Sequence, residues 1–264
     1  MKKIAILLLA ILIFSCSDDD EKGTVENKGQ LAMIFNESVK NDSNPVDKTE
    51  KFMFDGERLI QHIIKQRYFE EEISNEVNLS YSDNQVTVTT DYPTLVYTLN
   101  SEGYASQCVY SLSSQNRIYQ FSYSAEGYLT GIVENIDNTE YSSTSLTYEN
   151  GDITSISSKM NGLENKFIYE PGEESSTYHL PCLGLLEIHP LTFHIEALYA
   201  GLLGKDPRHF TIRSCPAGSN DEKTIYSYEF DKKGNPSRMI CQTTYAGGQA
   251  SYYPYTRNIS VSFE

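Results

Sequence analysis

The sequence predicts an all-β protein, in which an antiparallel up-and-down meander closes into a barrel. The main observation is a repeated hairpin pattern: an aromatic-rich strand, a polar turn with glycine, and a second strand. The pattern occurs around Gly103, Gly127, Gly151 and Gly234, with Ser or Thr three residues after each glycine and an apolar residue five after it. Because glycine readily adopts the positive φ of a short hairpin loop, each copy predicts two antiparallel strands.

The residues that flank these turns support the prediction, because they alternate with a period of two. Pairs such as Tyr97 with Leu99 and Phe121 with Tyr123 are typical of strands with one buried face. We interpret residues 58–69 as a further long strand, although their apolar residues also fit a helical stripe. Closing the meander hides both edges, and a curled open sheet is the alternative. A solenoid fits less well, because the interval from Gly151 to Gly234 breaks the period.

The predicted strands do not have the composition of a barrel that faces lipid. Residues 142–148 and 155–159 are polar on one face and sparse in large apolar side chains on the other. The chain also has no Trp for the aromatic girdles of a membrane barrel. We therefore expect a water-soluble barrel.

Residues 1–16 have the features of a lipoprotein signal peptide. Lys2 and Lys3 precede an apolar run that is too short to span a bilayer. The ending Leu12-Ile-Phe-Ser-Cys16 resembles a bacterial lipoprotein signal, which implies that Cys16 becomes the lipidated first residue of the mature protein. A core segment that happens to end in cysteine is the alternative.

Residues 17–50 are expected to form an acidic and polar tether ahead of a barrel domain at residues 51–264. Within the tether, only residues 31–35 look like a possible strand. The acidic block Ser17-Asp-Asp-Asp-Glu21 resembles the export signal of surface lipoproteins of the Bacteroidota. That resemblance implies a lipid-anchored protein of the outer membrane that faces the cell exterior, and a periplasm-facing lipoprotein with an acidic linker is the alternative.

The strand pattern stops between Tyr178 and Cys215, so residues 178–215 are predicted to be an insert. Pro190 suits the first turn of a helix, and the apolar-rich stretch 191–203 ends at Gly204, a typical C-terminal stop. The apolar residues cover more than one face of this helix. We therefore expect it to cap a barrel mouth or to plug the lumen.

Three features of the chain together resemble one known family. They are the acidic-tagged lipoprotein start, the Tyr-rich hairpin at residues 228–237, and the late helix followed by Leu-Leu-Gly-Lys-Asp-Pro at residues 202–207. These features are similar to those of uncharacterised Bacteroidota lipoproteins described as having a porin-like fold. The resemblance covers most of the chain after Lys51 and implies a porin-like barrel. It implies no catalytic residue.

The charge of the chain excludes some functions. Lys and Arg number 21 against 36 Asp and Glu, so the formal net charge is −15, which argues against nucleic acid and against docking on anionic lipid. The sequence contains no P-loop, nucleophile elbow, dinucleotide fingerprint or cysteine-protease signature. An enzyme is therefore not the favoured interpretation, and no cofactor is expected.

Besides Cys16 the chain has four cysteines, and export would permit disulfide bonds in any of three connectivities. Cys182 and Cys215 flank the insert, so a bridge between them would clamp it at its base. Cys108 and Cys241 would then pair, or remain as small buried apolar residues.

Histidines are concentrated in the insert, with carboxylates nearby, which raises the question of a metal site. They are His179, His189, His194 and His209. The interval of five residues between His189 and His194 places them poorly on one helical face, and no His-Glu-x-x-His motif occurs. We therefore predict no metal ligands.

The favoured function is a binding or structural module at the cell surface, with an extracellular glycan or peptide as ligand. Exposed tyrosines on a β surface can stack on such ligands. The candidates are Tyr245, Tyr252, Tyr253 and Tyr255, and packing of these rings inside the barrel is the alternative. A carrier of a lipid or other small ligand would need an open lumen. A hydrolase of an extracellular polymer would need two converging carboxylates.

Overall fold

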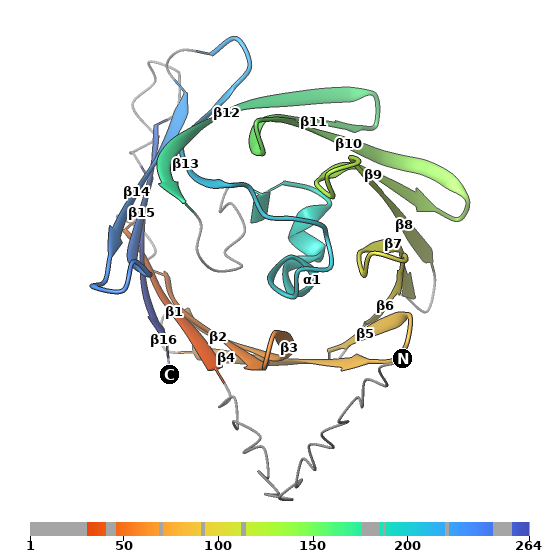
Figure 1. The fold of residues 1–264 in the computed structure, drawn as a ribbon, viewed down its shortest axis with the longest axis horizontal. Helices are drawn as coiled ribbons and strands as arrows, with labels where there is room; N and C mark the ends of the chain where they lie inside the picture. Colours follow the sequence, from red (N-terminus) through yellow and green to blue (C-terminus); the bar gives the residue numbers. More distant parts are fainter. Residues whose placement is uncertain are drawn as a thin grey trace, which may run out of the picture.

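The computed structural model describes residues 31–40, 46–68, 71–90, 93–111, 115–175, 185–186, 188–219, 222–244 and 255–263. Sixteen described strands form one closed barrel, in which every strand pairs antiparallel with its sequence neighbours and β1 pairs with β16 (Figure 1). The predicted all-β meander that closes into a barrel is therefore confirmed. The strands are β1 (Leu31–Lys40), β2 (Val46–Asp55), β3 (Arg58–Tyr68), β4 (Glu71–Tyr81), β5 (Gln85–Thr89), β6 (Thr94–Leu99), β7 (Ala105–Ser111), β8 (Asn116–Tyr123), β9 (Leu129–Ile136), β10 (Thr139–Glu149), β11 (Asp152–Met160), β12 (Leu163–Ser175), β13 (His209–Pro216), β14 (Lys223–Phe230), β15 (Pro236–Thr244) and β16 (Tyr255–Phe263).

The barrel begins at Leu31, ahead of the expected start near Lys51. β1 closes the ring, since Phe35 pairs with Glu50 of β2 on one side and with Val261 of β16 on the other. The sequence indicated a strand only at residues 31–35, because the polar residues that follow, among them the inward Glu37, concealed the rest of β1. The carboxylate of Glu37 is held by Arg257 Nε on β16 at 2.5 Å, so the charge is paired inside the seam.

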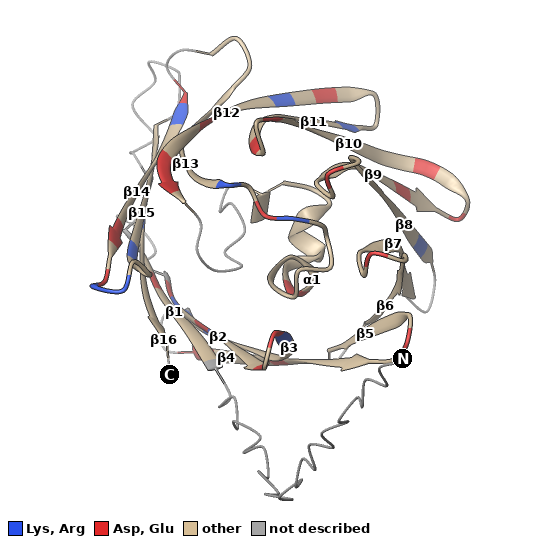
Figure 2. Ribbon diagram, viewed as in Figure 1, with Lys and Arg blue, Asp and Glu red and all other residues tan. Residues whose placement is uncertain are grey.

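Side chains alternate between a buried inner face and a polar outer face. On β4, Val77 and Leu79 are buried, whereas Glu76, Asn78 and Ser80 are exposed. The same alternation occurs on β5 and β10. Charged residues of both signs occur around the whole ring (Figure 2). Separately, none of the described helices is long and apolar enough to cross a membrane.

The repeated hairpins have the predicted turns, and the structure explains their invariant positions. Gly103, Gly127, Gly151 and Gly234 all have positive φ, between 83° and 91°. The hydroxyl three residues after the glycine donates to a carbonyl of the facing strand at Ser106, Thr154 and Ser237, over 3.0 to 3.2 Å. The hydroxyl therefore stabilises the bulged end of these three hairpins.

A second feature of these turns lies three residues before the glycine. Asn100, Ser124 and Asp231 each accept hydrogen bonds from two backbone N–H groups of the turn through the side chain. Short polar side chains at this position satisfy turn donors that have no strand partner. The turns around Gly103 and Gly234 are thus stabilised by a polar side chain before the glycine and by a hydroxyl after it.

The insert lies within the ring of strands in Figure 1, and its side chains pack against inward-facing residues of the wall such as Phe52 and Glu134. Its described part, residues 185–186 and 188–208, is called the plug here. It contains a short 3-10 helix, η2 (Leu191–Phe193), and one α-helix, α1 (Ile195–Tyr199). The prediction of an insert that caps or plugs the barrel is confirmed as a plug.

The C-terminal boundary of the insert differs from the prediction. β12 continues to Ser175 and β13 already begins at His209, so Cys215 lies within a strand rather than at the base of the insert. Phe210, Thr211 and Ile212 are β-forming residues that the sequence analysis assigned to the insert. β12 also passes through Pro171, where the pairing register with β13 shifts, instead of turning there.

The α-helix is also much shorter than the predicted helix over residues 191–203. It ends in a Schellman arrangement, in which Gly201 N donates to Leu198 O at 3.1 Å and Leu202 N donates to Ala197 O at 2.9 Å. Gly201 has a φ of 68°, so this glycine, and not Gly204, ends the helix. At the other end, the backbone of His194 is not helical and separates α1 from η2.

The plug and the inner wall form a single hydrophobic core. Leu191, Ala197, Leu198, Leu202 and Leu203 of the plug are all buried. Tyr199 lies with its ring centroid 4.0 Å from that of Phe52 on β2 and 5.9 Å from that of Phe35 on β1. The barrel is therefore filled where α1 lies.

After α1, the segment from Leu202 to Arg208 follows three successive hairpins of the wall. Ala105 N donates to Leu202 O at 2.7 Å, Lys205 N to Gly127 O at 2.9 Å, and Arg208 N to Gly151 O at 3.1 Å. Successive contacts are three residues apart along the plug, and three residues can span at most about 10 Å. Neighbouring hairpins on the ring are two strands, or about 9.6 Å, apart. The spacing of contacts along the plug thus matches the spacing of hairpins around the barrel.

Candidate functional site

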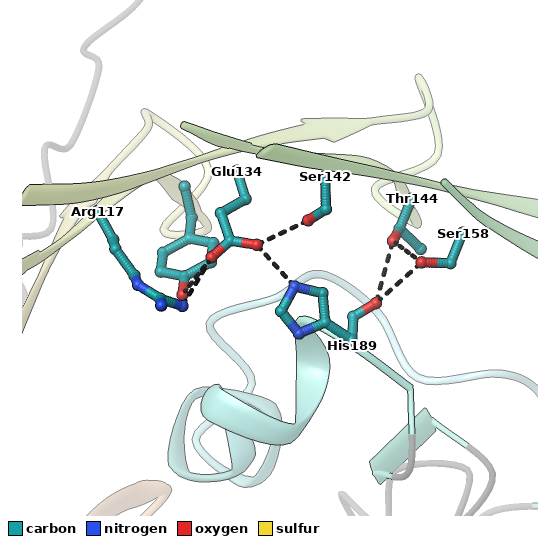
Figure 3. Close-up of polar contacts among 7 residues, drawn as sticks. Arg117, Glu134, Ser142, Thr144, Ser158 and His189 are labelled. Atoms are coloured by element: carbon teal, nitrogen blue, oxygen red, sulfur yellow. Dashed lines mark hydrogen bonds and ion pairs between the residues drawn. The ribbon is translucent and has the colours of Figure 1, made fainter. Parts of the chain in front are cut away.

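The carboxylate of Glu134, on β9, is the centre of the polar contacts between wall and plug (Figure 3). Its side chain is fully buried. Arg117 Nη1 and the Tyr119 hydroxyl lie 3.1 and 3.2 Å from Oε1, and Ser142 Oγ donates to Oε2 at 2.7 Å. His189 of the plug approaches Oε2 with Nε2 at 2.6 Å. Three wall residues and one plug residue therefore share one carboxylate.

The surroundings of Glu134 keep it ionised. Burial alone would raise the pKa of this carboxyl, but the hydrogen bonds from His189 and Ser142 and the nearby Arg117 charge outweigh burial and lower the pKa below 4.5. A buried carboxylate that lost these partners would be strongly destabilising. The cluster thus fixes the position of His189 against the wall.

The backbone of His189 forms a second connection with the wall. Its carbonyl oxygen accepts from Thr144 Oγ1 at 3.2 Å and from Ser158 Oγ at 3.3 Å (Figure 3). Thr144 Oγ1 and Ser158 Oγ, on β10 and β11, are 3.1 Å apart. Both the side chain and the main chain of His189 are therefore held, which orients the imidazole.

A buried histidine on β3 connects the other side of the plug to the barrel. His62 Nδ1 lies 2.8 Å from Glu196 Oε1 on α1, and His62 Nε2 forms an ion-pair contact of 3.4 Å with Glu50 Oε1 on β2. The imidazole stacks on Phe52 at a centroid distance of 4.0 Å. Burial alone would lower the pKa of His62, but the carboxylates of Glu196 and Glu50 outweigh it and raise the pKa above 6.5.

His194 has the opposite electrostatic environment, although it lies in the same plug. It is fully buried among the rings of Tyr97, Tyr119 and Phe121, and burial lowers its pKa to about 3. Its Nδ1 lies 2.7 Å from the Tyr97 hydroxyl. Burial raises the pKa of Tyr97, so the hydroxyl keeps its proton and donates to the neutral imidazole. His194 is a packing residue of the core.

Beside His189 the structure has a cavity of about 370 Å³, between the plug and the wall formed by β11 to β14. Its aromatic lining consists of Phe167, Tyr169 and Tyr226. Uncharged polar side chains complete the lining together with Ile188 and His189: Ser158, Asn161, Asn165, Ser214 and Thr224. No Asp, Glu, Lys or Arg is among the described residues that line it. The site therefore offers rings, hydroxyls and amides.

The rim of this cavity is the hairpin between β11 and β12. Asn161 and Gly162 have φ values of 51° and 78°, which define a tight two-residue turn. The apolar side chains on either side, Met160 and Leu163, line the cavity and are 38% and 73% exposed. A leucine so exposed beside a cavity is available to contact a ligand.

The residues predicted from sequence as a ligand site are not brought to this cavity by the described structure. Tyr245, Tyr252 and Tyr253 lie outside the described residues, and of Tyr255 only the backbone, on β16, is described. They stay a prediction. The insert was the other predicted location, and it does supply Ile188 and His189.

The disulfide between Cys182 and Cys215 also stays a prediction, because Cys182 and the lipidation candidate Cys16 lie outside the described residues. Cys215 is half-buried on β13, and Cys108 and Cys241 are buried in the core. Burial raises the pKa of the Cys108 thiol to about 12. Among the described residues no group of three His, Cys, Asp or Glu side chains is arranged to hold a metal ion.

Sequence reasoning missed Glu134 and the cavity residues. The signal for Glu134 was present, since the period of two places it on the same face as Ile132, inside the barrel. Asn165, Phe167 and Tyr169 also alternate on one face of β12. The sequence does not show where the plug lies in the barrel. The plug brings Ile188 and His189 next to these wall residues, and the cavity lies between them.

The fold and the site define a closed β-barrel with an internal plug and a cavity beside it. The family model described as a domain of unknown function (DUF4595) with porin-like fold matches residues 37–238, and the chain belongs to this family. No curated protein matches the chain.

Two solved crystal structures are similar to the barrel. One is a porin-like protein from Bacteroides uniformis ATCC 8492, with 26% identity, 88% of this chain and 96% of that chain covered, and a TM-score of 0.79. The other is a porin-like protein from Bacteroides vulgatus ATCC 8482, with 12% identity, 86% and 96% coverage, and a TM-score of 0.55. The second likeness shows the fold alone. The expected membership of a porin-like Bacteroidota family is confirmed.

The contact between His62 and its two carboxylates predicts a pH dependence of stability. Because the folded-state pKa of His62 is raised above 6.5, its stabilising contribution is complete below about pH 6.5 and is lost as the pH rises through the folded-state value. Urea unfolding followed by circular dichroism between about pH 6 and 9 should show a free energy of unfolding that decreases with pH. His62→Gln should flatten this decrease, and an unchanged slope in the variant would refute the assignment.

Proposed function

We propose that the protein is a binding module for a small, uncharged, polyhydroxylated ligand of the sugar class, held in the cavity beside His189. The observation that carries this proposal is the lining: three aromatic rings combined with hydroxyl and amide groups, without a described carboxylate or cation. A volume of about 370 Å³ lies within the range of small-molecule sites, roughly 300 to 1,000 Å³.

A sugar has two kinds of surface, and the lining has groups that suit each of them. A sugar ring has an apolar C–H face, which packs on aromatic rings, and a periphery of hydroxyls that need donors and acceptors. Asn161 and Asn165 can offer both kinds of group in their amides, and Ser158 and Thr224 can do so in their hydroxyls. A charged ligand would find no described counter-charge in the lining apart from His189.

Two other functions have less support from the described residues. A carrier that holds its ligand in an open lumen conflicts with the buried plug side chains, such as Leu198 and Tyr199, which pack against the wall. A hydrolase would need two carboxylates facing the substrate, but the described lining contains none, and Glu134 is fully buried with its oxygens committed to four donors.

The proposal extends to the location of the protein. A signal ending at Cys16, followed by four acids in the next five residues, supports a lipid-anchored protein of the outer membrane that faces the cell exterior. The polar outer wall supports a barrel that stands in water and reaches the membrane through its lipid. A cell-surface location would give the cavity access to extracellular glycans.

Sugar binding can be tested by a glycan array with the mature protein, followed by calorimetry on the monosaccharides and disaccharides that bind. Asn165→Ala removes one amide of the lining and should weaken binding about three- to tenfold, the effect of one lost hydrogen bond. The matched control is Asn75→Ala on β4, an exposed asparagine outside the lining, which should bind as the wild type does. The absence of any neutral sugar ligand, or equal loss in both variants, would contradict the proposal.

Lipid anchoring can be tested by metabolic labelling with radioactive palmitate in a bacterial host that processes lipoproteins. The wild type and Cys215→Ser should incorporate label and fractionate with the outer membrane, whereas Cys16→Ser should lose both label and membrane association. Digestion of intact cells by an added protease should degrade the wild type. Label retained in Cys16→Ser would contradict anchoring at that residue, and resistance in intact cells would contradict surface exposure.

A further inference from the structure

A second cleft, of about 290 Å³, opens where β12, β13 and β14 separate. On one side, the pairing of β12 with β13 shifts register between Glu170 and Pro171 and again before Ser175. Gly172 lies in this bulge, where a Cβ atom would come within 2.7 Å of Ile212 Cγ2. A larger residue at this position would therefore force the Ile212 side chain to shift beside the cleft.

On the other side, β13 and β14 share only two registered pairs in the described structure, Arg213 with Ile225 and Ser214 with Thr224. The residues of β14 that line the cleft are Tyr226, Ser227, Tyr228 and Phe230. Phe210 of β13 lies with its ring centroid 4.7 Å from that of Tyr228 and 5.8 Å from that of Phe230. The open seam is thus lined by three clustered rings.

Two carboxylates, Glu173 and Glu174, line the same cleft, and neither forms an ion pair with a described residue. Of the other exposed acids on these strands, Glu170 pairs with Arg213 and Glu229 pairs with Arg238, whereas Glu164 accepts a hydrogen bond from Ser157. No Lys or Arg is among the described residues that line the cleft. Unpaired negative charge therefore coincides with the aromatic rings.

We propose that this cleft is a binding site for an organic cation, an ammonium or guanidinium group on an aliphatic chain. An aliphatic chain packs on Phe230 and its neighbouring rings, and the cationic head is attracted both by ring faces and by the two carboxylates. Inorganic cations would gain little from the rings. The cation can belong to a free amine or to a Lys or Arg side chain of another protein, and the two sources share this chemistry.

The cleft is separate from the sugar cavity, since only Tyr226 lines both. The two ligand classes also differ in charge. Glu173, Glu174 and Phe230 do not line the sugar cavity, so substitutions there test the cation site alone. Failure of one proposal would leave the other standing.

The test is calorimetric or NMR titration of the mature protein with n-butylammonium chloride, with a short acetylated lysine peptide, and with n-butanol as the uncharged analogue. Both cations should bind and n-butanol should bind at least about tenfold more weakly. If the peptide binds more tightly than the free amine, the source is a protein partner; equal affinity identifies the free amine as a sufficient ligand.

Variants decide whether binding occurs in the cleft. The double variant Glu173→Gln/Glu174→Gln should lose about tenfold in affinity, and Phe230→Leu should lose a smaller factor. Glu102→Gln/Glu126→Gln removes the same charge from two exposed hairpin turns and should retain wild-type affinity. Equal loss in the control pair, or n-butanol binding as tightly as the cations, would overturn the proposal.

Discussion

The hydrogen bonds between the plug and three successive hairpins are the constraint on which the rest of the structure depends. A barrel of sixteen strands encloses more space than its own inward side chains can fill, so the chain must return inside it to bury them. The segment from Leu202 to Arg208 does this by meeting the hairpins at Ala105, Gly127 and Gly151 in turn. The contacts recur every three residues along the plug and once per hairpin, or every two strands, around the wall. The two distances are similar, so the plug can reach each hairpin in turn.

The charged contacts then select one orientation of the plug within this space. Glu134 holds His189 on one side, and Glu50 of the wall faces His62, which binds Glu196 of α1, on the other. Buried ion pairs contribute little net stability but penalise every arrangement that leaves a charge unpaired. In this orientation the plug leaves the cavity beside His189 between itself and the wall formed by β11 to β14. The site is thus a consequence of how the barrel is filled.

Features set by residues close together in the chain were predicted well from the sequence. Features that depend on contacts between distant residues were predicted less well. Turn glycines, strand alternation and a central apolar insert follow from residues close together in the chain, and each was confirmed. β1 was predicted only in part, over residues 31–35, because its pairing with β16 is set by residues more than two hundred positions away, such as Glu37 and Arg257. The helix was predicted too long, since apolar composition was mistaken for helical length, although Gly201 carried the stop signal. The role of Glu134 could not be predicted without its partner His189, which comes from the insert.

The direct test of the central claim, that plug and wall form one core, is a comparison of two glycine variants. Gly201→Ala and Gly204→Ala both place alanine at positive φ, at a similar cost of about 1 to 2 kcal/mol. At Gly201 the added Cβ meets open space, whereas at Gly204 it lies 2.6 Å from Gly127 O of the wall. In urea unfolding, Gly204→Ala should therefore have a free energy of unfolding about 1 to 3 kcal/mol lower than that of Gly201→Ala. This difference is the cost of overpacking the added Cβ against the wall. Equal stabilities would contradict the docking of the plug on the hairpins.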